Sequence, residues 1–194
     1  MDCAICILAA PFALLIGLII ALFIKADGGA VFYSQRRVGL GGRPFDCLKF
    51  RSMVPDADQR LEDLLARDPA ARTEWDRYQK LARDPRITAI GKLIRATSLD
   101  ELPQLINVWR GEMSIVGPRP IMTDQIPLYG EHFHDYCALR PGITGLWQVM
   151  GRNNCTFAER VHLDMEYART WSVARDLQII VLTIPAVIAG KGAR

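Results

Sequence analysis

One long uncharged apolar stretch near the N-terminus constrains the fold of this chain more than any other feature. Residues 3–24 contain no charged side chain, and Leu, Ile, Ala and Phe dominate them. A helix needs roughly 20 such residues to cross the hydrocarbon core of a bilayer. A cleaved signal peptide fits poorly, because Asp2 replaces the usual basic residues and the stretch runs directly into Lys25. We therefore predict a membrane helix over residues 1–25.

Pro11 lies inside this stretch and leaves two paths open. Proline lacks an N–H and kinks or interrupts a helix. The segment could cross the bilayer as a simple span, or it could enter and leave by the same face as a re-entrant anchor. The residues alone do not separate the two paths.

Length and charge limit the remaining possibilities. The 194 residues suit one domain of ordinary size. A net charge of +3 and a pI near 8.7 favour anionic surfaces or substrates, and they fall short of the strong basic excess of nucleic-acid-binding domains. Five cysteines, an odd number, are scattered along the chain and indicate a reducing compartment. We expect no nucleic-acid partner.

The rest of the chain predicts one mainly helical domain, residues 26–194, with a small β-hairpin. Residues 31–35 and 45–50 read as short strands on either side of a glycine-rich turn. Residues 56–86 show helical periodicity among many charges, and Asp68 before a proline divides this insert into a solvated helical hairpin. The expected fold class is α+β.

Three further helices are predicted. Residues 86–97 form an amphipathic pattern with a basic edge, which suits either the lipid headgroup region or a core position. Residues 177–189 are apolar but shorter than a typical span, so an interfacial or core helix is favoured. Thr156 and Glu159 form a capping box that begins a helix ending near Trp171.

The most suggestive motif for chemistry is the carboxylate pair Asp100 and Glu101, within residues 98–104 (SLDELPQ). A helix-compatible run follows, and a helix start stabilises negative charge through its unpaired N–H groups and its dipole. An ionised carboxylate can serve as a nucleophile or a metal ligand. A structural interpretation stands beside this one and is the more frequent meaning of such a pattern. Ser98 and Glu101 also form a capping box.

Basic residues near the hairpin are candidates for binding phosphate. Arg36, Arg37 and Arg43 flank the glycine-rich turn and read as a flexible basic loop, a weak phosphate-binding candidate. Lys49 and Arg51 occupy alternate strand positions and so share a face, which could hold a phosphate or meet solvent.

Two arginines flank the carboxylate pair in the sequence. Arg95 lies five residues before Asp100, close enough for a phosphate held by one to be attacked by the other. Arg119 lies between two prolines that fix its backbone. Rigid presentation of an arginine suits diphosphate recognition, although the same loop could be a structural turn.

A second polar cluster occupies residues 140–153. Arg140, Gln148, Arg152 and Asn153 offer planar hydrogen-bonding groups, among glycines and a tryptophan. Such a set would suit a nucleotide.

Taken together, these segments resemble the bacterial sugar transferase family, the monotopic phosphoglycosyl transferases that start polysaccharide assembly on a polyprenyl phosphate. Besides the proline-containing apolar segment, the matching motifs are VFYSQRRVG (31–39), KFRSM (49–53), TSLDELPQL (97–105), GEMSIVGPRP (111–120) and RPGITGLWQVMGRN (140–153). The helical insert and the GLWQV form look like the branch that transfers galactose 1-phosphate or glucose 1-phosphate.

The resemblance implies a membrane topology and a set of partners. It implies a re-entrant membrane helix over residues 1–25, broken at Pro11, with interfacial amphipathic helices, on the cytoplasmic face of the bacterial inner membrane. Its implied partners are membrane lipid, a UDP-sugar donor that loses UMP, and a polyprenyl (undecaprenyl) phosphate acceptor.

The resemblance also assigns the site. It implies Asp100 as nucleophile, Glu101 as its helper, and Mg²⁺ held by Asp100 and Glu101. The residues expected to bind substrate are Lys49, Arg51, Arg95, Arg119, Arg140, Gln148, Arg152 and Asn153.

Two other functions are compatible in principle with paired carboxylates and basic helices. Glycoside hydrolysis by paired carboxylates fits badly, because adjacent helical residues point about 100° apart instead of facing each other across a sugar. A non-enzymatic module that binds anionic lipid through its basic helices remains the alternative.

Overall fold

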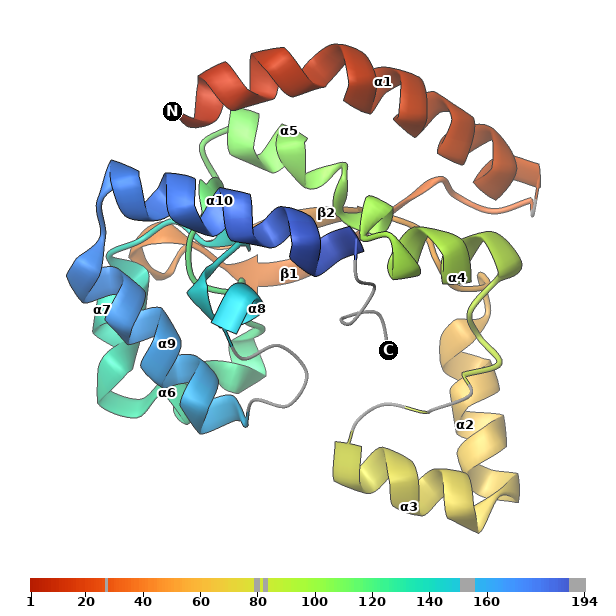
Figure 1. The fold of residues 1–194 in the computed structure, drawn as a ribbon. Coiled ribbons are helices and arrows are strands. Elements are labelled where there is room, and N and C mark those ends of the chain that lie inside the picture. Colours follow the sequence, from red (N-terminus) through yellow and green to blue (C-terminus); the bar gives the residue numbers. More distant parts are fainter. Residues whose placement is uncertain (27, 79–80, 82–83, 151–155, 189–194) are drawn as a thin grey trace.

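The fold is mainly helical, as the sequence predicts, and it contains two small sheets, of which the sequence predicts only the hairpin. The structure is a computed structural model that describes residues 1–26, 28–78, 81, 84–150 and 156–188 (Figure 1). Its helices and strands are α1 (Asp2–Ala26), β1 (Phe32–Val38), η1 (Leu40–Gly42), β2 (Pro44–Phe50), α2 (Ala57–Arg67), α3 (Pro69–Tyr78), α4 (Ala89–Ala96), η2 (Leu99–Glu101), α5 (Gln104–Trp109), β3 (Ser114–Val116), η3 (Thr123–Gln125), α6 (Ile126–Tyr129), η4 (Gly130–His132), α7 (Phe133–Cys137), β4 (Gly142–Thr144), α8 (Leu146–Met150), α9 (Phe157–Thr170) and α10 (Val173–Ile188).

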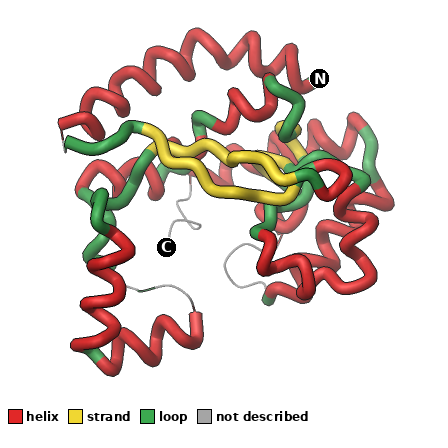
Figure 2. Tube along the Cα trace, turned by 180° about the vertical axis from the view of Figure 1, so that it is seen from behind, coloured by secondary structure: helices red, strands yellow, loops and turns green. Residues whose placement is uncertain are grey.

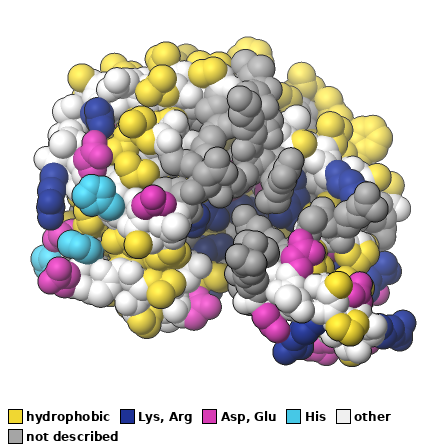
Figure 3. All heavy atoms as spheres, turned by 60° about the horizontal axis from the view of Figure 1, so that its bottom comes forward, with side chains coloured by type: hydrophobic (Ala, Val, Ile, Leu, Met, Phe, Trp, Pro, Cys, Tyr) yellow, Lys and Arg dark blue, Asp and Glu magenta, His cyan; other side chains and the backbone are white. Residues whose placement is uncertain are grey.

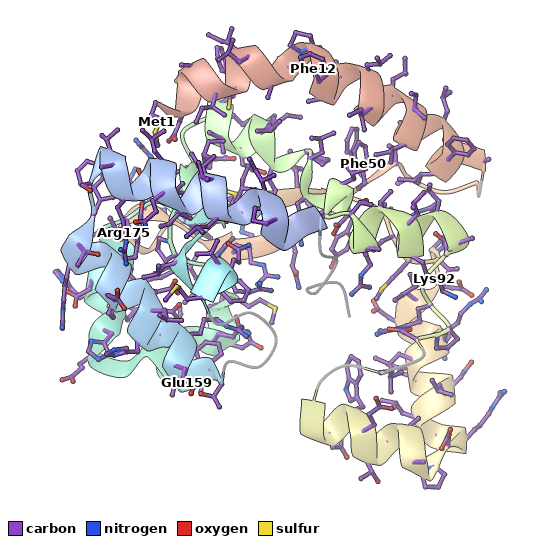
Figure 4. All side chains as sticks on the ribbon, in the orientation of Figure 1. Met1, Phe12, Phe50, Lys92, Glu159 and Arg175 are labelled. Atoms are coloured by element: carbon purple, nitrogen blue, oxygen red, sulfur yellow. The ribbon has the colours of Figure 1, made fainter. Side chains whose placement is uncertain are left out.

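Helix α1 runs along one side of the molecule, above α5 and the β1–β2 hairpin (Figures 1 and 2). Its inner face includes the buried Ile20 and Ile24, whereas Leu8 and Phe12 are more than 70% exposed, and Phe12 points away from the body (Figure 4). The helix is long and apolar enough to cross a membrane. Pro11 lies inside the helix and does not end it. The side on which each end of α1 meets the bilayer stays a prediction.

The β1–β2 hairpin confirms both predicted strands and lengthens the first. The pairing is antiparallel and extends from Phe32 opposite Phe50 to Val38 opposite Pro44. The flexible basic loop predicted around the turn is wrong in part, because Arg36 and Arg37 belong to β1 and are paired with β2. Of the predicted loop, only the turn between the two strands, which contains η1, lies outside the hairpin strands.

A second, parallel pair of strands joins two segments that are distant in the sequence. Ser114 pairs with Gly142, and the Gly142 N–H donates to the Pro118 carbonyl at 2.8 Å. The backbones approach so closely that a Cβ atom on Gly142 would lie 2.1 Å from the Gly117 nitrogen. Glycine is therefore required here, and the loop of residues 117–120 lies against residues 140–145.

The predicted helical insert forms an arm of α2 and α3 that projects from the body (Figure 1). Asp68 caps α3, since its Oδ1 accepts hydrogen bonds from the Ala70 and Ala71 N–H groups at 2.9 and 3.1 Å. The guanidinium of Arg86, which follows the arm in the sequence, lies 5.2 Å from the ring centre of Trp75 on α3.

The C-terminal helices also follow prediction. Thr156 and Glu159 form the reciprocal capping box that begins α9, which ends at Thr170. Helix α10 starts a few residues before the predicted boundary, buries Ile179, and leaves Leu177 and Val181 exposed.

Candidate active site

The carboxylate pair lies in the short turn η2, between α4 and α5. The capping box predicted for Ser98 and Glu101 is wrong, because the Ser98 side chain makes no capping hydrogen bond and its backbone is left-handed, with φ of 57°. Helix α5 begins only at Gln104, after Pro103. Asp100 and Glu101 are therefore presented by a tight turn and not by the first turn of an α-helix.

Lys49 on β2 faces this turn and binds both acids. Its Nζ lies 2.7 Å from Glu101 Oε1 and 3.9 Å from Asp100 Oδ2. All three side chains are less than a third exposed. The ion pair is thus partly shielded from water, where Coulomb interactions are stronger than at the surface.

Burial dominates the charge state of Asp100. Burial, the largest effect, and the neighbouring Glu101 raise the pKa of this carboxyl, Lys49 and Arg95 lower it, and the net result is a pKa of about 6. The predicted stabilisation of an ionised Asp100 by an α-helix start is not seen, because α5 begins only at Gln104. Asp100 is nonetheless mostly ionised at neutral pH. Because its pKa is raised, its carboxylate is a more basic nucleophile than an ordinary aspartate.

A small polar cavity opens beside the carboxylates and collects residues from five segments. It is lined by Arg37, Cys47, Lys49, Glu101, Gln104, Arg119, Pro120, Gly142, Ile143 and Gln148. Four of the residues predicted for the site, Lys49, Glu101, Arg119 and Gln148, thus share one cavity. On the face turned forward in Figure 3, Lys and Arg side chains lie within a central hollow, which favours an anionic substrate.

Arg119 is held rigidly, as its flanking prolines predict. Its guanidinium lies 4.8 Å from the ring centre of Trp147, within the range of a cation–π interaction. Pro118 is fully buried, and the Pro120 carbonyl accepts a hydrogen bond from Arg37 Nη1 at 3.1 Å.

Arg37 and Gln104 line the cavity but are not among the residues expected to bind substrate, and the sequence indicates Arg37 only as part of a weak phosphate-binding loop. Burial and the nearby charge of Arg119 lower the pKa of Arg37. Because Arg37 pairs with Phe45 and Gln35 pairs with Cys47, the hairpin register puts Arg37 on the face that carries Lys49. That register could have identified Arg37. Nothing in the sequence singles out Gln104, which is buried at the start of α5.

Other predicted residues lie elsewhere. Arg51 is buried just after β2, and its Nη2 donates to the Ile24 carbonyl at 3.1 Å, so it fastens the end of α1. Arg140 is exposed and does not line the cavity. Arg95 is half-buried on α4 and acts on Asp100 through its charge. Arg152 and Asn153 lie outside the described residues.

The carboxylate pair is also the candidate site for magnesium. Within the described part of the chain, no group of three or more His, Cys, Asp or Glu side chains could hold a metal ion. Asp100 and Glu101 supply only two carboxylates. Mg²⁺ is commonly bound by one or two carboxylates together with substrate phosphates and water, so the pair fits the ion when a phosphate substrate is present.

The fold and the site define a class of protein. Leu99 and Leu102, which flank the partly buried carboxylate pair, pack against a buried cluster that includes residues of the apolar N-terminal helix, and arginine and lysine side chains share a cavity with Glu101. This is the arrangement of a membrane-associated enzyme that acts on phosphate groups.

Comparison with known proteins identifies the family. A family model described as bacterial sugar transferase matches residues 1–190. The chain is 48% identical over 192 residues to an exopolysaccharide production protein, ExoY, of Rhizobium meliloti (strain 1021), covering 96% of this chain and 85% of that protein. This chain therefore belongs to the bacterial sugar transferase family, and it is a transferase.

Two other relatives carry more specific names. The undecaprenyl-phosphate galactose phosphotransferase of Salmonella typhimurium (strain LT2) is 48% identical over 170 residues, covering 88% of this chain and 36% of that protein. The UDP-glucose:undecaprenyl-phosphate glucose-1-phosphate transferase of Caulobacter vibrioides is 39% identical over 199 residues, covering 98% of this chain and 68% of that protein.

Proposed function

We propose that this protein transfers a hexose 1-phosphate, from UDP-galactose or UDP-glucose, to a polyprenyl (undecaprenyl) phosphate and releases UMP. This would be the first membrane step in the assembly of an exopolysaccharide. The observation that carries the proposal is the cavity in which Glu101 and Lys49, beside Asp100, meet Arg37 and Arg119. The names of the relatives support the same reaction and leave the choice of hexose to experiment.

In the proposed first step, a carboxylate oxygen of Asp100 attacks the phosphorus that bears the sugar. The bond from that phosphorus to the bridging oxygen breaks, and UMP leaves with the electron pair. The product is an aspartyl phosphosugar. An oxygen of polyprenyl phosphate then attacks the same phosphorus, forms the lipid diphosphosugar, and returns Asp100 to its ionised form.

Attack of one anion on another requires positive charge around the reacting atoms. Lys49 holds Glu101 and lies 3.9 Å from Asp100, and Arg119 and Arg37 line the adjoining cavity. Fixed cations of this kind stabilise the charge that develops on transferring phosphoryl groups. Glu101 keeps Lys49 in place next to the nucleophile.

We propose Mg²⁺ as the cofactor. Asp100 and Glu101 would hold it together with the phosphates of the donor. When bound, the ion would neutralise phosphate charge and so favour departure of UMP.

The proposed mechanism is tested by measuring UMP release from UDP-galactose and UDP-glucose, with and without polyprenyl phosphate. Wild-type protein should release up to one equivalent of UMP without acceptor and turn over with it. Asp100→Asn should lower turnover by at least about 1,000-fold and form no phosphosugar adduct.

Asp46→Asn serves as the control, because Asp46 is exposed on β2 and its carboxylate pairs only loosely with Arg36 at 3.5 Å. It should retain activity. Full activity or an unchanged adduct in Asp100→Asn would overturn the assignment. Absence of UMP release by wild-type protein over a panel of UDP-sugars would favour a non-enzymatic module at the membrane surface.

A further inference from the structure

Gln104 is a buried polar residue in the wall of the cavity beside the carboxylates. It is only 3% exposed, and it lines that cavity from the start of α5. Its carboxamide makes no hydrogen bond to any residue that the structure describes. Buried polar groups are nearly always hydrogen-bonded, so a buried carboxamide without a protein partner in a cavity wall points to a substrate group as its partner.

The second glutamine at the cavity provides a contrast. Gln148, on α8, donates a hydrogen bond from its Nε2 to the Ile143 carbonyl at 3.0 Å. The carboxylate of the cavity, Glu101, binds Lys49 at 2.7 Å. These side chains have protein partners that hold them in place, whereas Gln104 has two N–H donors and one oxygen acceptor to offer to a ligand.

The backbone places Gln104 next to the proposed nucleophile. Leu102 and Pro103 both have helical φ and ψ angles, so the turn η2 continues into α5 as one helical path. Residues three or four apart on such a path share a face, so Gln104 lies one turn beyond both Asp100 and Glu101. The part of the donor nearest to Gln104 is therefore the phosphoryl group that Asp100 attacks. The oxygens of that group accept hydrogen bonds.

A neutral donor suits this position better than a cation does. Lys49 already lies 3.9 Å from Asp100 and binds Glu101. A second cation one turn away would pair with Asp100 and stabilise its carboxylate, which would weaken it as a nucleophile. A carboxamide forms no ion pair, yet its N–H groups can stabilise the charge that develops on phosphoryl oxygens.

We propose that Gln104 is a substrate-binding residue whose side-chain N–H donates to a non-bridging oxygen of the transferred phosphoryl group, first in the UDP-sugar and then in the aspartyl phosphosugar. This inference rests on the function proposed above and deepens it. The contact serves both half-reactions, because that phosphoryl group takes part in both, whereas UMP takes part only in the first.

The inference is tested by measuring the two half-reactions separately in Gln104→Met, which keeps the side-chain volume and removes the hydrogen-bonding groups. The first is the single-turnover release of UMP without acceptor, and the second is the transfer of phosphosugar from the preformed adduct to polyprenyl phosphate. Each rate should fall by about 100-fold, and by the same factor for every UDP-sugar that the wild-type protein uses. Gln104→Glu, which replaces the donor by an ionisable oxygen, should be at least as slow at pH 8.

Melting temperatures separate this role from a structural one. Gln104→Met loses no hydrogen bond within the protein, so its melting temperature should equal or exceed that of the wild type. Gln148→Met removes the bond to the Ile143 carbonyl and should melt about 3 °C lower. Gln59→Met, which changes an exposed glutamine on α2, is the control for activity and should keep both rates.

The other outcomes would each overturn a defined part of the argument. Unchanged rates in Gln104→Met or Gln104→Glu, or a lower melting temperature in Gln104→Met, would show that Gln104 has no such role. A loss confined to UMP release would assign the contact to the UMP portion of the donor, and a loss that differs between UDP-sugars would assign it to the hexose. Both results would leave the proposed reaction intact. Absence of UMP release by wild-type protein would overturn the proposed function and this inference with it.

Discussion

At the scale of single residues, the charge of Asp100 is set by a balance between burial and Lys49. Burial raises the pKa of Asp100 and Lys49 lowers it, and the net pKa is about 6. A nucleophilic carboxylate must be ionised, so kcat/KM for UMP release should rise with pH through about 6 and level off above it.

Removing the lysine should shift this profile. Lys49→Met leaves burial and Glu101 to act unopposed on Asp100, so the rise in kcat/KM should move to higher pH, and activity at pH 7 should fall by about 10- to 100-fold. Lys92→Met, which changes an exposed lysine on α4, is the control and should keep the wild-type profile. An unmoved acidic limb in Lys49→Met would contradict the proposed electrostatic role of the lysine.

The site could be predicted from the sequence only as far as local spacing reaches. Alternation along a strand put Lys49 and Arg51 on one face, but β2 ends at Phe50 and the chain then turns toward α1. Arg51 consequently binds the Ile24 carbonyl. To place Arg37 in the site, one must know which residue of β2 it pairs with. That pairing depends on the exact position of the turn, which the local sequence does not fix.

At the scale of elements, two similar sequence patterns have different outcomes. Thr156 and Glu159 form a capping box, whereas Ser98 and Glu101 do not. Both fit the pattern of a capping serine or threonine with glutamate three residues later. The difference is a tertiary contact, because Lys49 binds the Glu101 carboxylate. No window of local sequence contains that information.

The two patterns should therefore respond differently to mutation. Thr156→Ala removes the acceptor of the Glu159 N–H and should lower the free energy of unfolding by about 1 kcal/mol. Ser98→Ala removes no capping hydrogen bond and should change it by less than about 0.5 kcal/mol. Denaturant titrations of the two variants in the same detergent make the comparison. Equal losses would indicate that Ser98 caps the turn in solution.

At the scale of the whole molecule, α1 is fastened to the body at both ends. Near its start, Asp2 Oδ1 accepts a hydrogen bond from the Ile115 N–H at 3.4 Å, and Cys6 is buried against the core. Near its end, Arg51 donates to the Ile24 carbonyl. A helix that crossed a bilayer would place its ends roughly 30 Å apart along the membrane normal, and both could not then contact one globular body. This geometry supports a re-entrant path, which Pro11 and the curvature of α1 would accommodate.

Labelling of single cysteines in intact cells and inverted vesicles tests that path. One variant keeps Cys3, which is naturally exposed, and another carries Lys25→Cys. We expect a membrane-impermeant thiol reagent to label each of these two cysteines from the cytoplasmic side only. Each cysteine is placed in a background in which the other cysteines are replaced by serine or alanine, and UMP release confirms that each variant is folded. Phe12→Cys, on the outer face of the helix, should resist labelling from either side because it lies in the hydrocarbon region. Labelling of residue 3 only from outside the cell would show that α1 crosses the bilayer, and the contacts of its first turn with the body would then have to be absent in the membrane.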